Sequence, residues 1–324
     1  MNKWLSFLIV LLLSLSSAWA IDFSDPSYDP KTDPKNILKY IPDNTLTTVG
    51  FVCYLLVGLS QTYMTFRYGA RHMLYMVVAA YTYSLGLVMR YGLHSNPQNK
   101  NLYIAENTLV VLSPCGFIAA NYVLLGRLSR WLKGSDHLWI RPTRIAVIFV
   151  ASDITTFLIQ GTGGGLTVTD DPDRAKLGQD IFLAGLILQL VSFALFTIIY
   201  LRFLYRVRKY EPYVWRKHSR LPFLQDWRSL AFALCISAVG VLVRSFYRVV
   251  ELAQGYSGYL ATTEVFFYAL DALPLFIATA VFVPFWPGRY IPPTKELLES
   301  ESVETELGVT PGASGHTLLY TSAA

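Results

Sequence analysis

Seven long apolar stretches, separated by short polar loops, run along the chain after residue 44. Each holds 17 to 24 residues, which is about the length of an α-helix that crosses a lipid bilayer. The pattern therefore predicts an all-α, polytopic membrane protein with seven transmembrane helices. We expect the spans at Thr45–Phe66, Met73–Tyr91, Leu102–Leu125, Ile145–Gly161, Asp180–Leu201, Ser229–Leu252 and Thr262–Phe285.

The first twenty residues have the pattern of a secretory signal peptide. Lys3 supplies the basic start, Leu5–Leu15 the apolar core, and Ala18-Trp19-Ala20 a cleavage site with small residues. The alternative is an uncleaved first helix, for which the apolar core is short. We expect a signal peptide over residues 1–20, an irregular extracellular segment over 21–43, a seven-helix transmembrane domain over 44–285, and a disordered, acidic cytoplasmic tail over 286–324.

Basic residues gather in alternate loops between the predicted spans. With the N-terminus outside, the cytoplasmic loops hold fifteen lysine and arginine residues, and the segments outside hold six. This is the positive-inside bias, and it agrees with the orientation that the signal peptide predicts. We therefore expect the N-terminus outside, the C-terminus in the cytoplasm, and delivery to the plasma membrane by the secretory pathway.

Composition narrows the classes of function. Hydrophobic residues make up 53% of the chain and charged residues 15%, whereas soluble domains carry about 25% charge. The net charge of +5 resides in short loops rather than on a soluble domain, so we expect no nucleic-acid partner. The five histidines lie outside the spans and the three cysteines form no metal-binding motif. We expect neither a cofactor nor enzymatic activity.

The informative residues are polar groups inside the apolar spans. Seven ionisable side chains buried against lipid would cost on the order of 20 kcal/mol, so they must face each other or water. Several repeat at helical spacing, as Arg244, Arg248 and Glu251 do at i, i+4 and i+7. We expect a polar interior that forms a binding or translocation site, and the alternative is a purely structural ion-pair network. The candidate site residues are Arg90, Asp153, Gln160, Gln189, Arg244, Arg248, Glu251, Glu264, Tyr268 and Asp271.

Backbone features accompany these polar residues. The glycine-rich run 161–165 closes the fourth span, and it either lets the backbone approach a ligand or forms a flexible loop. Pro114 and Pro274 should kink the third and seventh spans, and carbonyl groups freed at such kinks often line cavities. Trp286-Pro287-Gly288 should end the last helix.

Spans three to seven carry a set of residues that resembles one family. They are Pro114, Ala119-Ala120-Asn121-Tyr122 and Gly126-Arg127, then Ser152-Asp153, Gln160 and Gly163-Gly164-Gly165, then Gly185-Leu186 and Gln189, and finally Arg244-Ser245-Phe246-Tyr247-Arg248-Val249-Val250-Glu251, Gly255, Gly258, Glu264, Tyr268, Asp271 and Pro274. Together they resemble the fungal lipid-translocating exporters, or RTA-like proteins, which include a sphingoid long-chain base exporter. The resemblance runs from about Tyr40 to Pro293, and the block from Arg244 to Pro274 is its most specific part. It implies a protein that exports or flips amphipathic lipids and confers resistance to toxic amphiphiles.

The chain departs from this family's pattern in the second span. The family usually has Glu-x-x-Gly-Tyr-x-x-Arg there, and in this chain Tyr83 takes the place of the glutamate ahead of Arg90. If that acid meets a cationic head group in relatives, the resemblance implies another ligand preference for this member.

Two functions remain open from the sequence. The first is a translocator whose partners are membrane lipids or amphiphilic small molecules, with carboxylates that bind an ammonium and arginines that hold those carboxylates ionised or bind phosphate. The chain has no Walker A pattern, so coupling would use protons through a carboxylate such as Asp271, or be absent. The second is a seven-helix receptor or stress sensor that acts indirectly on lipid asymmetry.

Overall fold

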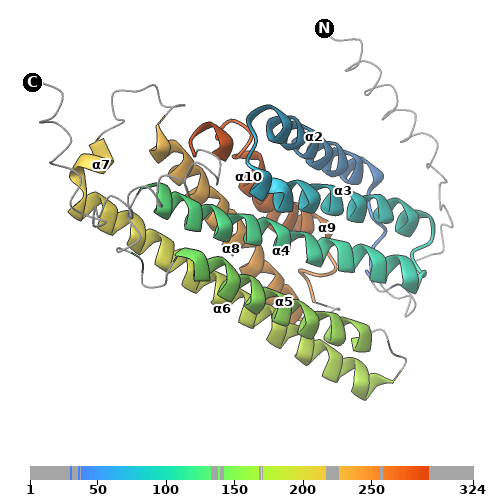
Figure 1. Ribbon diagram of the computed structural model, residues 1–324. Coiled ribbons are helices and arrows are strands. Elements are labelled where there is room, and N and C mark those ends of the chain that lie inside the picture. Colours follow the sequence, from blue (N-terminus) through green and yellow to red (C-terminus); the bar gives the residue numbers. More distant parts are fainter. Residues whose placement is uncertain are drawn as a thin grey trace, which may run out of the picture.

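The computed structural model describes residues 30, 36, 38–132, 138, 142–167, 169, 171–216, 226–255 and 258–291 (Figure 1). The predicted signal peptide, most of the predicted extracellular segment and the tail from residue 292 lie outside these residues.

Every regular element in the described part is helical. Six helices are long and apolar enough to cross a membrane: α2 (Asn44–Tyr68), α3 (Leu74–Ser95), α4 (Lys100–Trp131), α5 (Pro142–Thr167), α6 (Pro172–Tyr210) and α8 (Trp227–Ala253). The shorter elements are η1 (Arg71–Met73), α7 (Pro212–Arg216), α9 (Glu264–Phe266), the π-helix η4 (Phe267–Ala272), α10 (Leu273–Ala280) and η5 (Pro287–Arg289).

Polar caps explain where several long helices begin. The side chains of Asp43, Asn99, Asp171 and Asp226 each accept a hydrogen bond from a backbone N–H in the first turn that follows. These bonds satisfy donors that have no partner inside a helix. Single carboxylate or amide side chains therefore fix the residue at which each of these helices begins.

The helices pack in a closed ring that follows the chain order. Each of α2, α3, α4, α5, α6, α8 and α10 contacts the next, and α10 returns to contact α2. Helix α4 also contacts α6 and α8, and it crosses the middle of the bundle in Figure 1. Within their apolar windows α4 is 67% buried and α8 61%, against 22% for α2 and 28% for α5. α4 and α8 are therefore the inner helices of the bundle, and the candidate site lies beside them.

The predicted seventh span corresponds to three short elements in succession. α9, η4 and α10 run from Glu264 to Ala280, and turns continue to Phe285. The last α-helix thus ends at Ala280, and not at Trp286 as the sequence suggested. The irregular backbone expected at Pro274 takes the form of the π-helix that precedes it, in which the Leu273 N–H bonds to the Tyr268 carbonyl.

The glycine-rich run is helical, so its interpretation as a flexible loop was wrong. Helix α5 continues through it to Thr167, six residues beyond the expected end of the span at Gly161. A Cβ on Gly163 would meet the backbone of Gly178 and Phe182 on α6. The glycine therefore allows α5 and α6 to approach closely, as small residues do between membrane helices.

The chain remains folded past the last predicted span. Trp286 is fully buried, and its indole N–H donates to the Gly69 carbonyl at 3.3 Å. Tyr290 and Ile291 are also buried. Residues 286–291 therefore close the turn between α2 and α3, and the folded part of the chain extends at least to Ile291.

Candidate functional site

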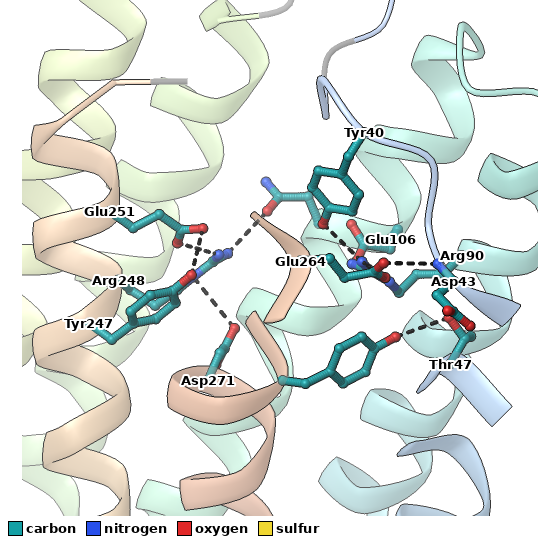
Figure 2. A network of polar contacts seen from close by, with 12 residues as sticks. Tyr40, Asp43, Thr47, Arg90, Glu106, Tyr247, Arg248, Glu251, Glu264 and Asp271 are labelled. Atoms are coloured by element: carbon teal, nitrogen blue, oxygen red, sulfur yellow. Dashed lines mark hydrogen bonds and ion pairs between the residues drawn. The ribbon is translucent and has the colours of Figure 1, made fainter. Parts of the chain in front are cut away.

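An open pocket of about 740 Å³ lies at the end of the bundle where α2 and α4 begin and α3 and α8 finish. We call it the end pocket. Its polar lining comes from Tyr40, Arg90, Glu106, Asn107, Arg248 and Glu251, and its apolar lining includes Val110, Phe182, Leu186, Leu252 and Phe267. Two groups of charged residues, each centred on arginine, flank this space (Figure 2).

The first group, the Arg90 cluster, consists of Tyr40, Arg90, Glu106 and Glu264. The Arg90 guanidinium is 1% exposed and bonds to Glu106 at 3.0 Å, to Glu264 at 2.9 Å and to the Tyr40 hydroxyl at 2.9 Å. Its carbon lies 4.3 Å from the centroid of the Phe267 ring. One arginine therefore ties the segment before α2 to α3, α4 and α9.

Two further bonds fix this cluster to the start of α2. The second oxygen of Glu264 accepts the Asp43 N–H at 2.9 Å, and the hydroxyls of Tyr268 and Thr47 lie 3.0 Å apart. Burial raises the pKa of Tyr40 to about 12, and the Arg90 charge opposes part of that rise. Tyr40 is consequently a neutral hydrogen-bond acceptor for Arg90 at physiological pH.

The second group, the Arg248 cluster, consists of Arg244, Arg248, Glu251 and Asp271. Arg248 bonds to Glu251 at 2.8 Å and lies 3.8 Å from Asp271. Arg244 is paired with the fully buried Asp271 through Nε and Oδ1, although these atoms lack hydrogen-bond alignment. The three residues predicted to share one face of α8 therefore do lie together. Their partner, Asp271, belongs to the π-helix η4.

A proline on α4 helps to position Arg244. Pro114 has no N–H, so the Val110 carbonyl four residues earlier has no helical partner. That carbonyl instead accepts a bond from Arg244 Nη2 at 3.0 Å and one from the Ser113 hydroxyl at 3.2 Å. The carbonyl freed by this proline therefore binds a site arginine, and α4 runs through Pro114 as one helix.

Tyr83, the departure in the second span, lies beneath the Arg248 cluster. It is fully buried and stacks on Tyr54 with ring centroids 4.1 Å apart, and the Tyr54 hydroxyl donates to the Ala272 carbonyl at 2.7 Å. Asp271 lies within electrostatic range of Tyr83. A glutamate at this position would add another carboxylate beside Asp271, so tyrosine makes the region less negative.

Three candidate residues lie apart from both clusters. Gln160 on α5 donates to Gln189 on α6 at 2.9 Å, and Gln189 donates to the Cys115 sulfur at 3.6 Å. Asp153 is 3% exposed, and its carboxylate has no ion pair or hydrogen bond among the described residues. The Tyr122 hydroxyl is near it, outside hydrogen-bond geometry. Asp153 therefore joins neither ion-pair cluster, and it lines a separate crevice between α4 and α5.

Sequence reasoning missed four residues that complete the clusters. Glu106 neutralises Arg90, Tyr40 bonds to it, Asn107 accepts from Arg248 at 3.3 Å, and Tyr247 donates to Glu251 at 3.3 Å. Glu106 carried a usable signal, since it is an acid inside an apolar span. Tyr40 had none, because it precedes the spans in a segment without periodicity.

The charges of the two clusters do not cancel. Arg90, Arg244 and Arg248 face four carboxylates, those of Glu106, Glu251, Glu264 and Asp271. With all seven ionised the region carries one net negative charge, which favours a cation over a phosphate. In the described part of the chain, no three His, Cys, Asp or Glu side chains are arranged to hold a metal ion.

Comparison with known proteins identifies relatives. A sequence model of the family described as RTA1 like protein matches residues 76–294. The chain is 32% identical over 200 residues to Protein RTM1 of Saccharomyces cerevisiae, covering 61% of this chain and 62% of the relative. It is 29% identical over 203 residues to Protoporphyrin uptake protein 1 of the same species, covering 61% and 63%.

A third similar yeast protein is Sphingoid long-chain base transporter RSB1, at 26% identity over 256 residues, which cover 70% of this chain and 65% of that one. The matches thus span less than two thirds of the length of each of these three relatives. No solved structure matches the chain significantly.

Proposed function

The chain belongs to the RTA1-like family, and from that premise we propose that it translocates amphipathic lipids with a cationic head group, such as sphingoid long-chain bases, across a membrane. The end pocket is the observation that carries this proposal. The two clusters that flank it carry one net negative charge when all seven groups are ionised, and this charge beside buried apolar walls suits an ammonium group attached to a hydrocarbon chain. The relative that is named a sphingoid long-chain base transporter supports the same substrate class.

Within this proposal, Glu251 and Glu106 are the residues that meet the ammonium. Both line the end pocket, and their side chains are 15% and 6% exposed. Arg248 and Arg90 hold these carboxylates in place, while Asn107 and Tyr40 offer polar partners for hydroxyl groups on the head. Asp271, buried beneath them, serves to position Arg244 and Arg248 rather than to touch the lipid.

The proposal includes seven spans with the N-terminus outside. The segment 264–280 would be the seventh, short and broken by η4. The end pocket lies where α2 begins, so in this orientation it faces the outer leaflet, and the basic residues at the opposite end face the cytoplasm. Resistance to toxic amphiphiles at the plasma membrane would follow from outward movement of such lipids.

A liposome assay tests this function. Purified protein is reconstituted, and transbilayer movement of a fluorescent sphingoid base with a free ammonium is compared with that of its N-acylated, neutral analogue. We expect wild-type protein to move the ammonium probe faster. Glu251→Gln should slow the ammonium probe by about tenfold or more, because one charge-assisted bond is lost, and should narrow the difference between the probes.

Asp180→Asn is the matched control. Asp180 is exposed on α6, two residues from the pocket residue Phe182, and does not line the pocket. It should leave both rates unchanged. If wild-type protein binds the ammonium probe but moves neither probe faster than empty liposomes do, translocation is refuted and the receptor or sensor interpretation replaces it.

A further inference from the structure

Two smaller openings continue from the end pocket along the contact between α4 and α5. The first, the glycine crevice, shares Tyr103, Asn107 and Phe182 with the end pocket. The second, the Asp153 crevice, shares Phe157 with the glycine crevice. The three openings form a series from the end of the bundle to the middle of α4 and α5.

This seam between α4 and α5 opens sideways, onto the surface that lipid would cover. Its rim includes large apolar side chains that are well exposed, namely Ile104 at 40%, Leu112 at 39% and Ile154 at 56%. Gly161 and Gly165 line it as well, and nothing lies within 4 Å of the position where a Cβ on either would project. The glycines thus keep the seam open along α5.

Two residues that line this seam carry buried hydrogen-bond acceptors without a partner among the described residues. Gln160 lines the glycine crevice, is 1% exposed, and uses its amide N–H on Gln189, so its Oε1 atom is left unbonded among the described residues. Asp153 lines the next crevice with both carboxylate oxygens unbonded in the same part of the chain. Buried acceptors without partners cost free energy. Two such acceptors along one seam therefore suggest that a ligand passing through the seam bonds to them for a short time.

The spacing of these acceptors places them on one face. Asp153 and Gln160 are seven residues apart on α5, which is two helical turns, or about 10 Å along the axis. Gln160 in turn lines the glycine crevice, which shares lining residues with the end pocket. The carboxylates of the end pocket, the Gln160 amide and the Asp153 carboxylate therefore form successive steps toward the bilayer centre.

We propose that the seam between α4 and α5 is the path along which the head group of a single amphiphile moves, with Gln160 and Asp153 as successive acceptors. This rests on the proposed function and adds its route. The hydrocarbon chain stays in the surrounding lipid through the open side of the seam. A head group that donates hydrogen bonds, such as an ammonium with neighbouring hydroxyls, fits these acceptors. A phosphate, which offers only acceptors when fully ionised, does not.

The test uses the same proteoliposomes and the same two fluorescent probes. Asp153→Asn keeps the side-chain shape and removes the unpaired charge, so it should not weaken the fold. It should slow the ammonium probe by about tenfold or more and affect the neutral probe less. Gly161→Leu should slow both probes, because its side chain projects into the seam from a position with free space.

Thr162→Leu is the matched control, since Thr162 is exposed on the same helix, bonds only to the Leu158 carbonyl of its own turn, and does not line the crevices. It should leave both rates unchanged. If wild-type protein moves lipid while Asp153→Asn and Gly161→Leu match it, the seam is not the path, although the proposed function stands. If wild-type protein moves neither probe, the proposed function itself fails and the route falls with it.

Discussion

Replacing Arg90 with methionine should destabilise the protein more than any exposed substitution. The change leaves two buried carboxylates, Glu106 and Glu264, without their cation. Removing one partner of a buried ion pair costs about 3–5 kcal/mol, and the lost contact with the Phe267 ring adds about 1–2 kcal/mol. For a helical domain of this size we expect the unfolding temperature to fall by on the order of 10 °C.

The assay is thermal unfolding of purified protein in detergent, followed by loss of helical circular dichroism. Arg289→Met is the matched control, because Arg289 also stacks on an aromatic ring, at 4.5 Å from the Tyr68 centroid, but is exposed. It should cost less than about 1 kcal/mol. Arg90→Lys should be intermediate, since one ammonium cannot bond both acids and Tyr40 with the geometry of a guanidinium.

A repair variant separates charge from packing. Arg90→Met combined with Glu106→Leu and Glu264→Gln removes the cation and both charges that depend on it, so it should recover much of the lost stability. The reasoning would be refuted if Arg90→Met unfolded within about 2 °C of wild type, or if the triple variant were less stable than the single one.

Two further predictions concern helix packing and pH. Gly163→Ala should cost about 1–3 kcal/mol, because its Cβ meets backbone atoms of α6, whereas Gly165→Ala should be neutral or stabilising, since that position is open; equal unfolding temperatures would contradict this packing. Because the folded-state pKa of Tyr40 is raised to about 12 from the usual 10, this tyrosine contributes stability below pH 10 that is lost as the pH rises to 12. Tyr40→Phe should therefore make the unfolding free energy fall less steeply between pH 10 and pH 12, by the equivalent of one bound proton. The measurement is the unfolding free energy at a series of alkaline pH values. A slope equal to that of wild type would count against the buried environment of Tyr40.

Much of the architecture could be predicted because lipid imposes simple rules on sequence. An apolar stretch of sufficient length must satisfy its own backbone, so α2, α3, α4, α5, α6 and α8 were readable from hydropathy alone. The face shared by Arg244, Arg248 and Glu251 was readable for a similar reason, since charges inside a span have to meet partners. Their spacing revealed that they share a face, and the position of Asp271 suggested where the partner lies.

The division of those charges into two clusters could not be predicted from the sequence. Arg90 and Arg248 each centre a separate cluster, because the ring closes with α9 and η4 between α3 and α8 and divides the acids between two arginines. Nothing in the local sequence of Gln160 distinguishes an amide that pairs with α6 from one that faces a pocket. The glycine-rich run was ambiguous for the same reason, since only tertiary contacts show that Gly163 packs on α6 while Gly161 and Gly165 do not.

The two acidic partners of Arg90 become available at very different times during synthesis. Glu106 follows Arg90 by 16 residues and Glu264 by 174. At roughly 5–20 residues per second, the first arrives within about 3 s and the second only after about 9–35 s. Arg90 and Glu106 should therefore insert together, as a neutral pair inside the α3–α4 hairpin. The nascent chain then holds a stable half-site in the bilayer until the C-terminal segment arrives to complete it.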